Sequence, residues 1–232
     1  MSNECLNCEA KLNGTFCSEC GQPASTGRYS FRALGNEIYG QFRKLDISTT
    51  AKTFWELIRR PGEFVHSYLA GRRVGFLNPV KFFFYSFVAN VLVSGWIVWL
   101  TNDRQFEATA SGFRYEIASF VSTIFWGLLW ALFYRRSKLN TVENIVAAIL
   151  FVGQANFLSL IGQVATAPFV IELPAARNYF EVAQLGVYVV YSFFFSATVF
   201  RDPWYLLIPK QLVLVLMLVI VAGLVAIGSS LI

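Results

Sequence analysis

The sequence predicts an all-α polytopic membrane protein with about five transmembrane helices and a small cysteine-rich head. Three observations predict this fold. Apolar residues make up 56% of the 232 residues and charged residues only 14%, whereas soluble domains are nearer a quarter charged. Long apolar runs fill the chain from residue 79 onward, and every cysteine lies near the N-terminus. This composition excludes a disordered chain, a collagen-like chain and a soluble disulfide scaffold.

Residues 1–22 form the predicted head, which contains two C-x-x-C pairs: Cys5, Cys8, Cys17 and Cys20. Each pair can present two thiolates to one ion, and a hairpin turning at Asn13-Gly14 can bring the pairs together. Four sulfurs at tetrahedral geometry suit Zn²⁺, and a closed set of four ligands leaves no open position for catalysis. Gly21 allows the positive φ that such a turn needs. The pattern therefore predicts a zinc-ribbon-like head with structural zinc. Two disulfides or a redox dithiol are the alternatives, and disulfides require an oxidising compartment.

Residues 23–78 are predicted to be a linker followed by basic amphipathic helices at the membrane interface. One helical stripe has apolar residues spaced three and four apart: Phe31, Leu34, Ile38, Phe42 and Leu45. A second helix is expected over residues 48–60, where Pro61-Gly62 stops it. A short third helix over residues 63–70 should end at Gly71.

This segment carries four arginines predicted to contact lipid headgroups or a partner: Arg59, Arg60, Arg72 and Arg73. We call residues 28–78 the basic collar. Its apolar faces would lie at the headgroup boundary and its arginines would meet phosphates. The alternative is that these charges only enforce the topology of the chain.

Residues 79–232 are predicted to form a transmembrane bundle, because five apolar runs follow one another and the first is long enough to cross about 30 Å of hydrocarbon, while the second is shorter. The predicted spans are residues 80–100, 117–134, 142–165, 182–200 and 206–227. The third is the least apolar, and Pro168 and Pro174 are expected to break the chain after it. Pro209 falls in the first turn of the fifth, where proline is tolerated.

The distribution of Lys and Arg predicts the orientation. Basic residues cluster before the first span, between the second and third spans and after the fourth, whereas the opposite loops hold only Arg104, Arg114 and Arg177. No secretory signal peptide is visible before the first apolar run. We therefore expect a multi-pass protein of the bacterial inner membrane with a cytoplasmic N-terminus.

Catalytic signals are sparse. Glu63 and His66 are one helical turn apart, but His66 is the only histidine, so a zinc-protease motif cannot be completed. No nucleophile elbow, P-loop or dinucleotide fingerprint occurs. Inside the spans, Asn90, Gln154 and Asn156 are the candidates for an intramembrane polar site, although buried amides more often bond between helices than line a path.

Several short motifs resemble those of a known family: Cys20-Gly21-Gln22, residues 57–62 (LIRRPG), residues 68–73 (YLAGRR) and Asn78-Pro79. The sequence over roughly residues 5–85 is similar to a bacterial domain-of-unknown-function family of membrane proteins. That family has a zinc-ribbon-like head and a few C-terminal spans. The resemblance implies location and architecture, and it implies no catalytic residues.

Three functions stay open at this point. The first is a membrane adaptor or regulator whose zinc ribbon and collar bind a protein partner or lipid headgroups. The second is a channel or transporter for a small neutral or lipidic solute. The third is a membrane enzyme acting on lipid headgroups. Membrane lipids are the expected partners, a homo-oligomer is compatible with the sequence, and nucleic acid is not expected because no base-reading module is visible.

Overall fold

The computed structural model describes residues 4–30, 47–101, 113–172 and 177–230. Residues 4–30 form turns and isolated bridges, and helices dominate the described residues from 47 onward. No strand forms in these ranges. The elements are α2 (Ile47–Arg59), α3 (Pro61–Leu69), α4 (Pro79–Thr101), α6 (Phe113–Phe133), the 3-10 turn η1 (Arg135–Ser137), α7 (Thr141–Glu172), α8 (Arg177–Phe200) and α9 (Trp204–Ser230). The predicted all-α fold class is confirmed. The apolar stripe from Phe31 to Leu45 and Arg104 lie outside the described residues.

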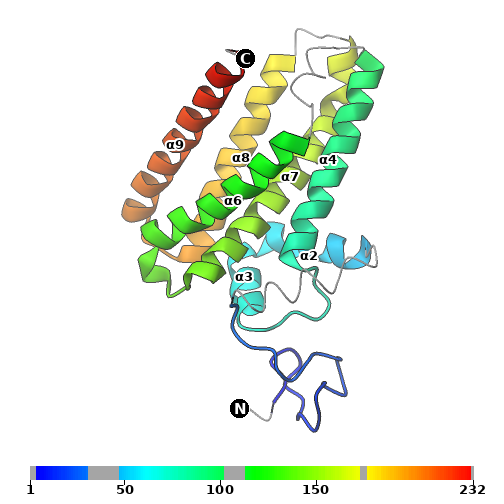
Figure 1. Ribbon diagram of the computed structural model, residues 1–232, viewed down its shortest axis with the longest axis vertical. Coiled ribbons are helices and arrows are strands. Elements are labelled where there is room, and N and C mark those ends of the chain that lie inside the picture. Colours follow the sequence, from blue (N-terminus) through cyan, green and yellow to red (C-terminus); the bar gives the residue numbers. More distant parts are fainter. Residues whose placement is uncertain (1–3, 31–46, 102–112, 173–176, 231–232) are drawn as a thin grey trace.

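The five long helices form a bundle, and α2, α3 and the head lie at one end of it (Figure 1). α2 lies across the base of α4, α3 lies beside it, and the head projects beyond α3. Helix α7 is central, because α4, α6 and α8 all pack against it, while α9 packs against α8. Residues 142–151 of α7 are buried without interruption. A helix that is apolar all round belongs in such a position.

Aromatic rings fill the core around α7. The Phe151 ring centroid lies 5.5 Å from that of Trp130 on α6, and 5.7 and 5.2 Å from those of Tyr191 and Phe195 on α8. Because each large ring removes much apolar surface from solvent, this cluster joins three helices in a single packed unit.

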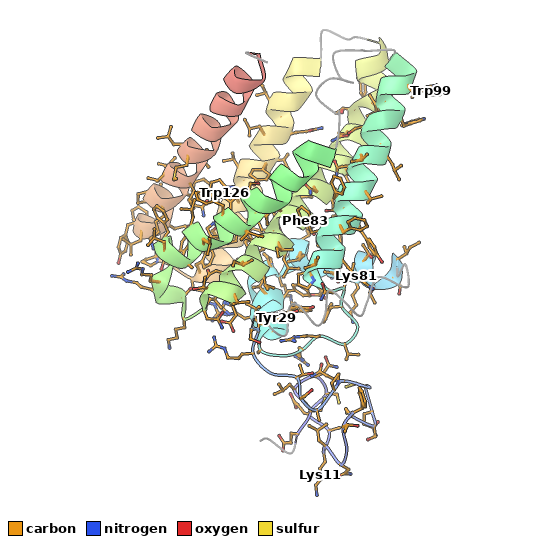
Figure 2. The ribbon with its side chains drawn as sticks, viewed as in Figure 1. Lys11, Tyr29, Lys81, Phe83, Trp99 and Trp126 are labelled. Carbon is orange, nitrogen blue, oxygen red and sulfur yellow. The ribbon has the colours of Figure 1, made fainter. Side chains whose placement is uncertain are left out.

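Three helical segments are long and apolar enough to cross a membrane: Pro79–Ile97, Thr141–Phe169 and Val182–Phe200. Helices α6 and α9 contain shorter apolar stretches within the described residues, Ser122–Phe133 and Trp204–Met217. Apolar side chains such as Trp99 on α4, which is 77% exposed, point away from the bundle (Figure 2). These helices identify a membrane protein, and five crossings stay a prediction.

The expected break at Pro168 is wrong, because α7 continues through it to Glu172. Pro168 has no N–H to donate to the Val164 carbonyl, and in a membrane helix neighbouring helices and small backbone adjustments can compensate for such a loss. The second expected break, at Pro174, lies outside the described residues.

The collar helices α2 and α3 lie close to their predicted ranges, but Pro61 has a different role. It is not only the end of α2, because it occupies the first turn of α3. A proline is favoured there, since the missing N–H would have no helical partner. Pro79 has the same position at the start of α4. Asn78, just before it, caps that helix, since its Oδ1 accepts the Val80 N–H at 2.9 Å.

The α6–α7 and α8–α9 connections lie at the same end of the bundle as the head, and the last turns of α9 lie at the other end (Figure 1). These connections carry basic residues that the orientation prediction assigns to one side: Arg135, Arg136, Lys138 and Arg201. The head, α2, α3 and these loops therefore share one face of the protein.

Candidate metal centre

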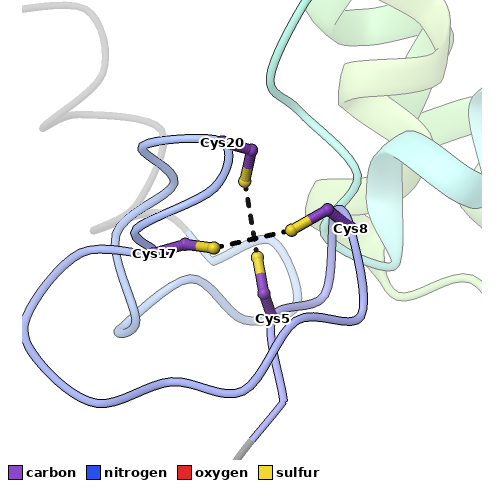
Figure 3. Close-up of side chains that lie close together, drawn as sticks. All are labelled: Cys5, Cys8, Cys17 and Cys20. Carbon is purple, nitrogen blue, oxygen red and sulfur yellow. Dashed lines mark hydrogen bonds between the residues drawn. The ribbon is translucent and has the colours of Figure 1, made fainter.

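The cysteine side chains of the head converge on one point from two loops (Figure 3). All four sulfur atoms lie within 4.8 Å of one another. The Sγ atoms of Cys5 and Cys20 are 3.6 Å apart, and those of Cys8 and Cys17 are 3.5 Å apart. A disulfide bond would require about 2.05 Å, so neither pair is bonded. A tetrahedron with metal–sulfur bonds of about 2.3 Å has edges of about 3.8 Å. The donor set and its size therefore fit one metal ion.

Two backbone turns of the same design hold the cysteines. The N–H of Glu9 donates to the Cys5 carbonyl at 2.8 Å, and the N–H of Gly21 donates to the Cys17 carbonyl at 2.9 Å. Glu9 and Gly21, which each follow the second cysteine of a pair, have φ of 64° and 73°. The predicted positive φ at Gly21 is confirmed, and Glu9 adopts the same conformation despite its side chain.

The hairpin contacts of the head lie around each cysteine pair. Isolated bridges join Glu4 to Lys11 and Phe16 to Pro23. The expected single hairpin between the pairs, turning at Gly14, is not what brings them together. Each pair instead occupies the tip of its own small hairpin. The backbone N–H groups of Cys8 and Asn7 lower the pKa of the Cys5 thiol to about 7, whereas burial and the neighbouring sulfurs raise the pKa of the Cys8 thiol to about 12.

Two collar arginines hold the head against the bundle. The Arg72 Nε donates to the Asn7 carbonyl at 3.4 Å, and an Arg73 Nη donates to the Gly27 carbonyl at 2.6 Å. The Arg73 backbone N–H also donates to the Gln22 side chain at 3.4 Å. The structure thus places two predicted headgroup contacts against the head itself.

The turn after α3 is shaped for this contact. Gly71 ends α3 with φ of 118°, and a Cβ there would lie 2.8 Å from the Leu6 side chain. The Arg73 guanidinium lies 3.9 Å from the centroid of the Tyr29 ring, which stacks on Tyr68 of α3. A cation over an aromatic face is attractive, so this stack continues the docking surface from the head to α3.

The other two predicted headgroup contacts lie on the surface. The Arg59 guanidinium is 5.2 Å from the centroid of the Trp55 ring. Arg60 and Glu63 form an ion pair at 3.4 Å in which both side chains are exposed. Such exposed pairs contribute about 0–1 kcal/mol, so a ligand can displace Glu63 from Arg60. Arg59 and Arg60 are both exposed and stay accessible to a ligand.

The intramembrane amides occupy two different environments. Asn90 on α4 donates to the Asn156 carbonyl on α7 at 2.8 Å and accepts from Gln163 at 3.2 Å. Gln154 shares none of these bonds. Its side chain is fully buried, and neither of its polar atoms has a hydrogen-bond partner within the described residues. Asn90 and Asn156 therefore act together as a link between helices, and Gln154 stands apart from them.

An ion pair that sequence reasoning missed joins the segment after the head to the bundle. Arg28 donates to both carboxylate oxygens of Glu143, at 2.8 and 2.6 Å, and this bonding raises the pKa of Arg28. Glu143 and Asn140 also form a capping box at the start of α7, since each side chain accepts the other's backbone N–H at 2.8 Å. The Asn-x-x-Glu spacing was a readable signal for the cap, but nothing in the sequence pairs it with Arg28.

A family model described as "Protein of unknown function (DUF3667)" matches residues 50–89. The matched segment covers most of α2, all of α3 and the first half of α4. It supports a domain-of-unknown-function family for this part of the chain. The searches of curated proteins and of solved structures give no significant match.

Proposed function

We propose that this protein is a membrane adaptor or regulator of the bacterial inner membrane. Its head would hold structural Zn²⁺ on the cytoplasmic side and bind a protein partner, while its basic collar contacts lipid headgroups. One observation carries the proposal: a closed four-cysteine centre is fixed to the collar by Arg72 and Arg73. A site of four thiolates serves structure, and a head of this size needs the metal to fold.

The collar supports contact with lipid. Helix α2 lies across the base of the bundle (Figure 1) and exposes Ile47 and Trp55. Arg59 lies beside Trp55. An aromatic side chain next to a basic one on a surface helix is typical of the headgroup boundary.

The head supports contact with a protein. It projects beyond α3, away from the spans (Figure 1), and its Phe16 side chain is 62% exposed. An apolar side chain held on a metal-stabilised loop away from the membrane suits a protein surface.

The other two functions gain less support. A transport path would use the amides of Asn90, Gln154 and Asn156 in one cavity. The side chains of Asn90 and Asn156 instead bond between α4 and α7, and Gln154 shares none of these bonds. A general acid–base pair would use Glu63 and His66, yet Glu63 pairs with Arg60. The His66 Nε2 donates to the Val199 carbonyl at 2.8 Å.

Site-specific photo-cross-linking in native membranes tests the proposal. A photoreactive amino acid at Phe16 should give a discrete protein adduct, and the same group at Trp99, at the far end of α4, should give lipid adducts only. The Phe16 adduct should disappear in a Cys17→Ser background, and the purified wild-type chain should contain one zinc ion. Absence of a protein adduct at Phe16, or an adduct indifferent to Cys17→Ser, would refute the role of the metal-bound head.

A further inference from the structure

A cleft of about 750 Å³ is lined by residues of α3 and of the two connections that lie at the head's end of the bundle, and His66 is the one residue weighed in the sequence analysis of function that lines it. Three regions form its walls: α3, the connection between α6 and α7, and the connection between α8 and α9. Its charged and ionisable lining residues are Arg28, His66, Arg136, Lys138, Glu143, Arg201 and Asp202.

The two acids of the cleft are already neutralised. Glu143 is paired with Arg28, and Asp202 forms an ion pair with Lys210 of α9. Within the ranges that the structure describes, Arg136, Lys138 and Arg201 form no ion pair. Three exposed positive charges from two separate loops therefore line one cleft with no acid left for them. Like charges gathered in this way favour an anionic ligand.

Two of these cations have an unusual backbone. Lys138 and Arg201 have φ of 60° and 54°. Lys138 ends η1, and Arg201 directly follows the last residue of α8. Glycine is the ordinary residue at such helix ends because any other L-residue is strained there. The positive-inside rule requires basic residues in these loops but does not require them at positions of positive φ. The rule therefore does not explain why Lys138 and Arg201 occupy these positions.

The rest of the cleft lining is apolar, and a hydrogen bond between α3 and α8 holds one wall in place. Leu69, Leu139, Phe200 and Pro203 line the cleft beside the cations. The bond between His66 and the Val199 carbonyl fixes α3 to the end of α8 at the cleft wall. A ligand with an anionic group and an apolar part fits such walls better than a bare ion does.

We propose that this cleft binds a phosphate monoester through Arg136, Lys138 and Arg201. A phosphate offers several acceptor oxygens to guanidinium and ammonium donors. The cleft lies where the spans end, and its lining residue Pro203 directly precedes the exposed Trp204 at the start of α9. A lipid headgroup can therefore supply the phosphate, as can a soluble ester. The inference rests on the membrane setting of the proposed function and is independent of any partner of the head.

Binding is tested with the zinc-bound full chain in phosphatidylcholine nanodiscs. One arm adds phosphatidic acid to the bilayer and counts bound lipid by native mass spectrometry. The other arm titrates glycerol 3-phosphate by calorimetry. Binding of phosphatidic acid alone assigns the lipid headgroup, and binding in both arms assigns the phosphate ester itself.

The variants include a matched control. Arg136→Ala should weaken binding about fivefold, which corresponds to about 1 kcal/mol per basic residue at a membrane surface. Arg135→Ala removes an equal charge from a neighbouring exposed residue that does not line the cleft, and it should leave the affinity unchanged. Lys138→Gly and Arg201→Gly should each weaken binding to a similar extent while keeping or raising the melting temperature, since glycine accepts positive φ.

Two results would overturn the inference. The first is no saturable binding of either probe by the wild-type chain. The second is an equal loss with Arg135→Ala and Arg136→Ala, which would reduce the effect to general surface charge. The Phe16 cross-link is measured separately, so failure of the cleft and failure of the head's role can be told apart.

Discussion

Replacing Arg28 with alanine tests whether the protein tolerates the buried carboxylate of Glu143 without its ion-pair partner. Glu143 is only 1% exposed and accepts two hydrogen bonds from Arg28, at 2.8 and 2.6 Å, and one from the Asn140 N–H. Arg28 itself is 66% exposed. The pair is therefore asymmetric, because loss of the arginine leaves a buried charge and loss of the acid leaves a solvated one.

The expected magnitudes follow from this asymmetry. Removing one partner of a fully buried ion pair costs about 3–5 kcal/mol. Water can partly replace the exposed Arg28, and the Asn140 N–H and the N-terminus of α7 still stabilise Glu143. We therefore expect Arg28→Ala to lower the free energy of unfolding by about 2 kcal/mol. Glu143→Gln keeps the side-chain oxygen of the capping box and should cost less than about 1 kcal/mol.

The assay is thermal unfolding of the purified protein in detergent, followed by circular dichroism. For a chain of this length, 1 kcal/mol corresponds to about 2–4 °C, so Arg28→Ala should melt about 4–8 °C below wild type. The double variant Arg28→Ala/Glu143→Gln should melt close to Glu143→Gln alone, because the buried charge is gone. A double variant as unstable as Arg28→Ala, or an Arg28→Ala variant as stable as wild type, would refute the reasoning.

Three further outcomes are expected. Gly62→Ala places a Cβ 2.3 Å from the Thr198 carbonyl oxygen and should lower the melting temperature through a loss of about 1–3 kcal/mol. Gly95→Ala, with nothing within 4 Å, should not lower it. Cys17→Ser should abolish zinc retention, measured by elemental analysis, and increase hydrogen exchange in the head but not in α7. Glu9→Gly should relieve strain at φ of 64° and slow zinc loss to a chelator, and faster loss would contradict this.

Local patterns predicted much of the fold and the metal centre. The metal centre could be predicted because its four cysteines lie close together in the sequence. The structure brings all four sulfurs together as predicted. The predicted helices over residues 48–60 and 63–70 lie close to Ile47–Arg59 and Pro61–Leu69. Both depend on a helical period and on glycine or proline at the ends, which are properties of the local chain.

Contacts between distant segments could not be read in the same way. Gly62 permits α3 to meet the backbone of α8 at Thr198, and a single sequence gives no sign of that neighbour. Arg72 and Arg73 are adjacent basic residues before the first span, a pattern typical of a headgroup site. In the fold, however, both donate hydrogen bonds to backbone carbonyls of the N-terminal segment. Lys138 and Arg201 looked like ordinary loop charges, because positive φ at a non-glycine residue depends on the surrounding structure.

The segment from Gln22 to Tyr29 links the metal centre to the cleft. Gln22 and Gly27 accept hydrogen bonds from Arg73, and Tyr29 lies under the Arg73 guanidinium. Arg28, between them, reaches Glu143 and also donates to the Lys138 carbonyl at 3.3 Å. Because Arg28 neutralises the buried acid, the cations opposite it are free to bind an anion. On the proposed function, loss of the metal from the head would loosen this segment, so the charge balance of the cleft would depend on a centre formed by residues at the start of the chain.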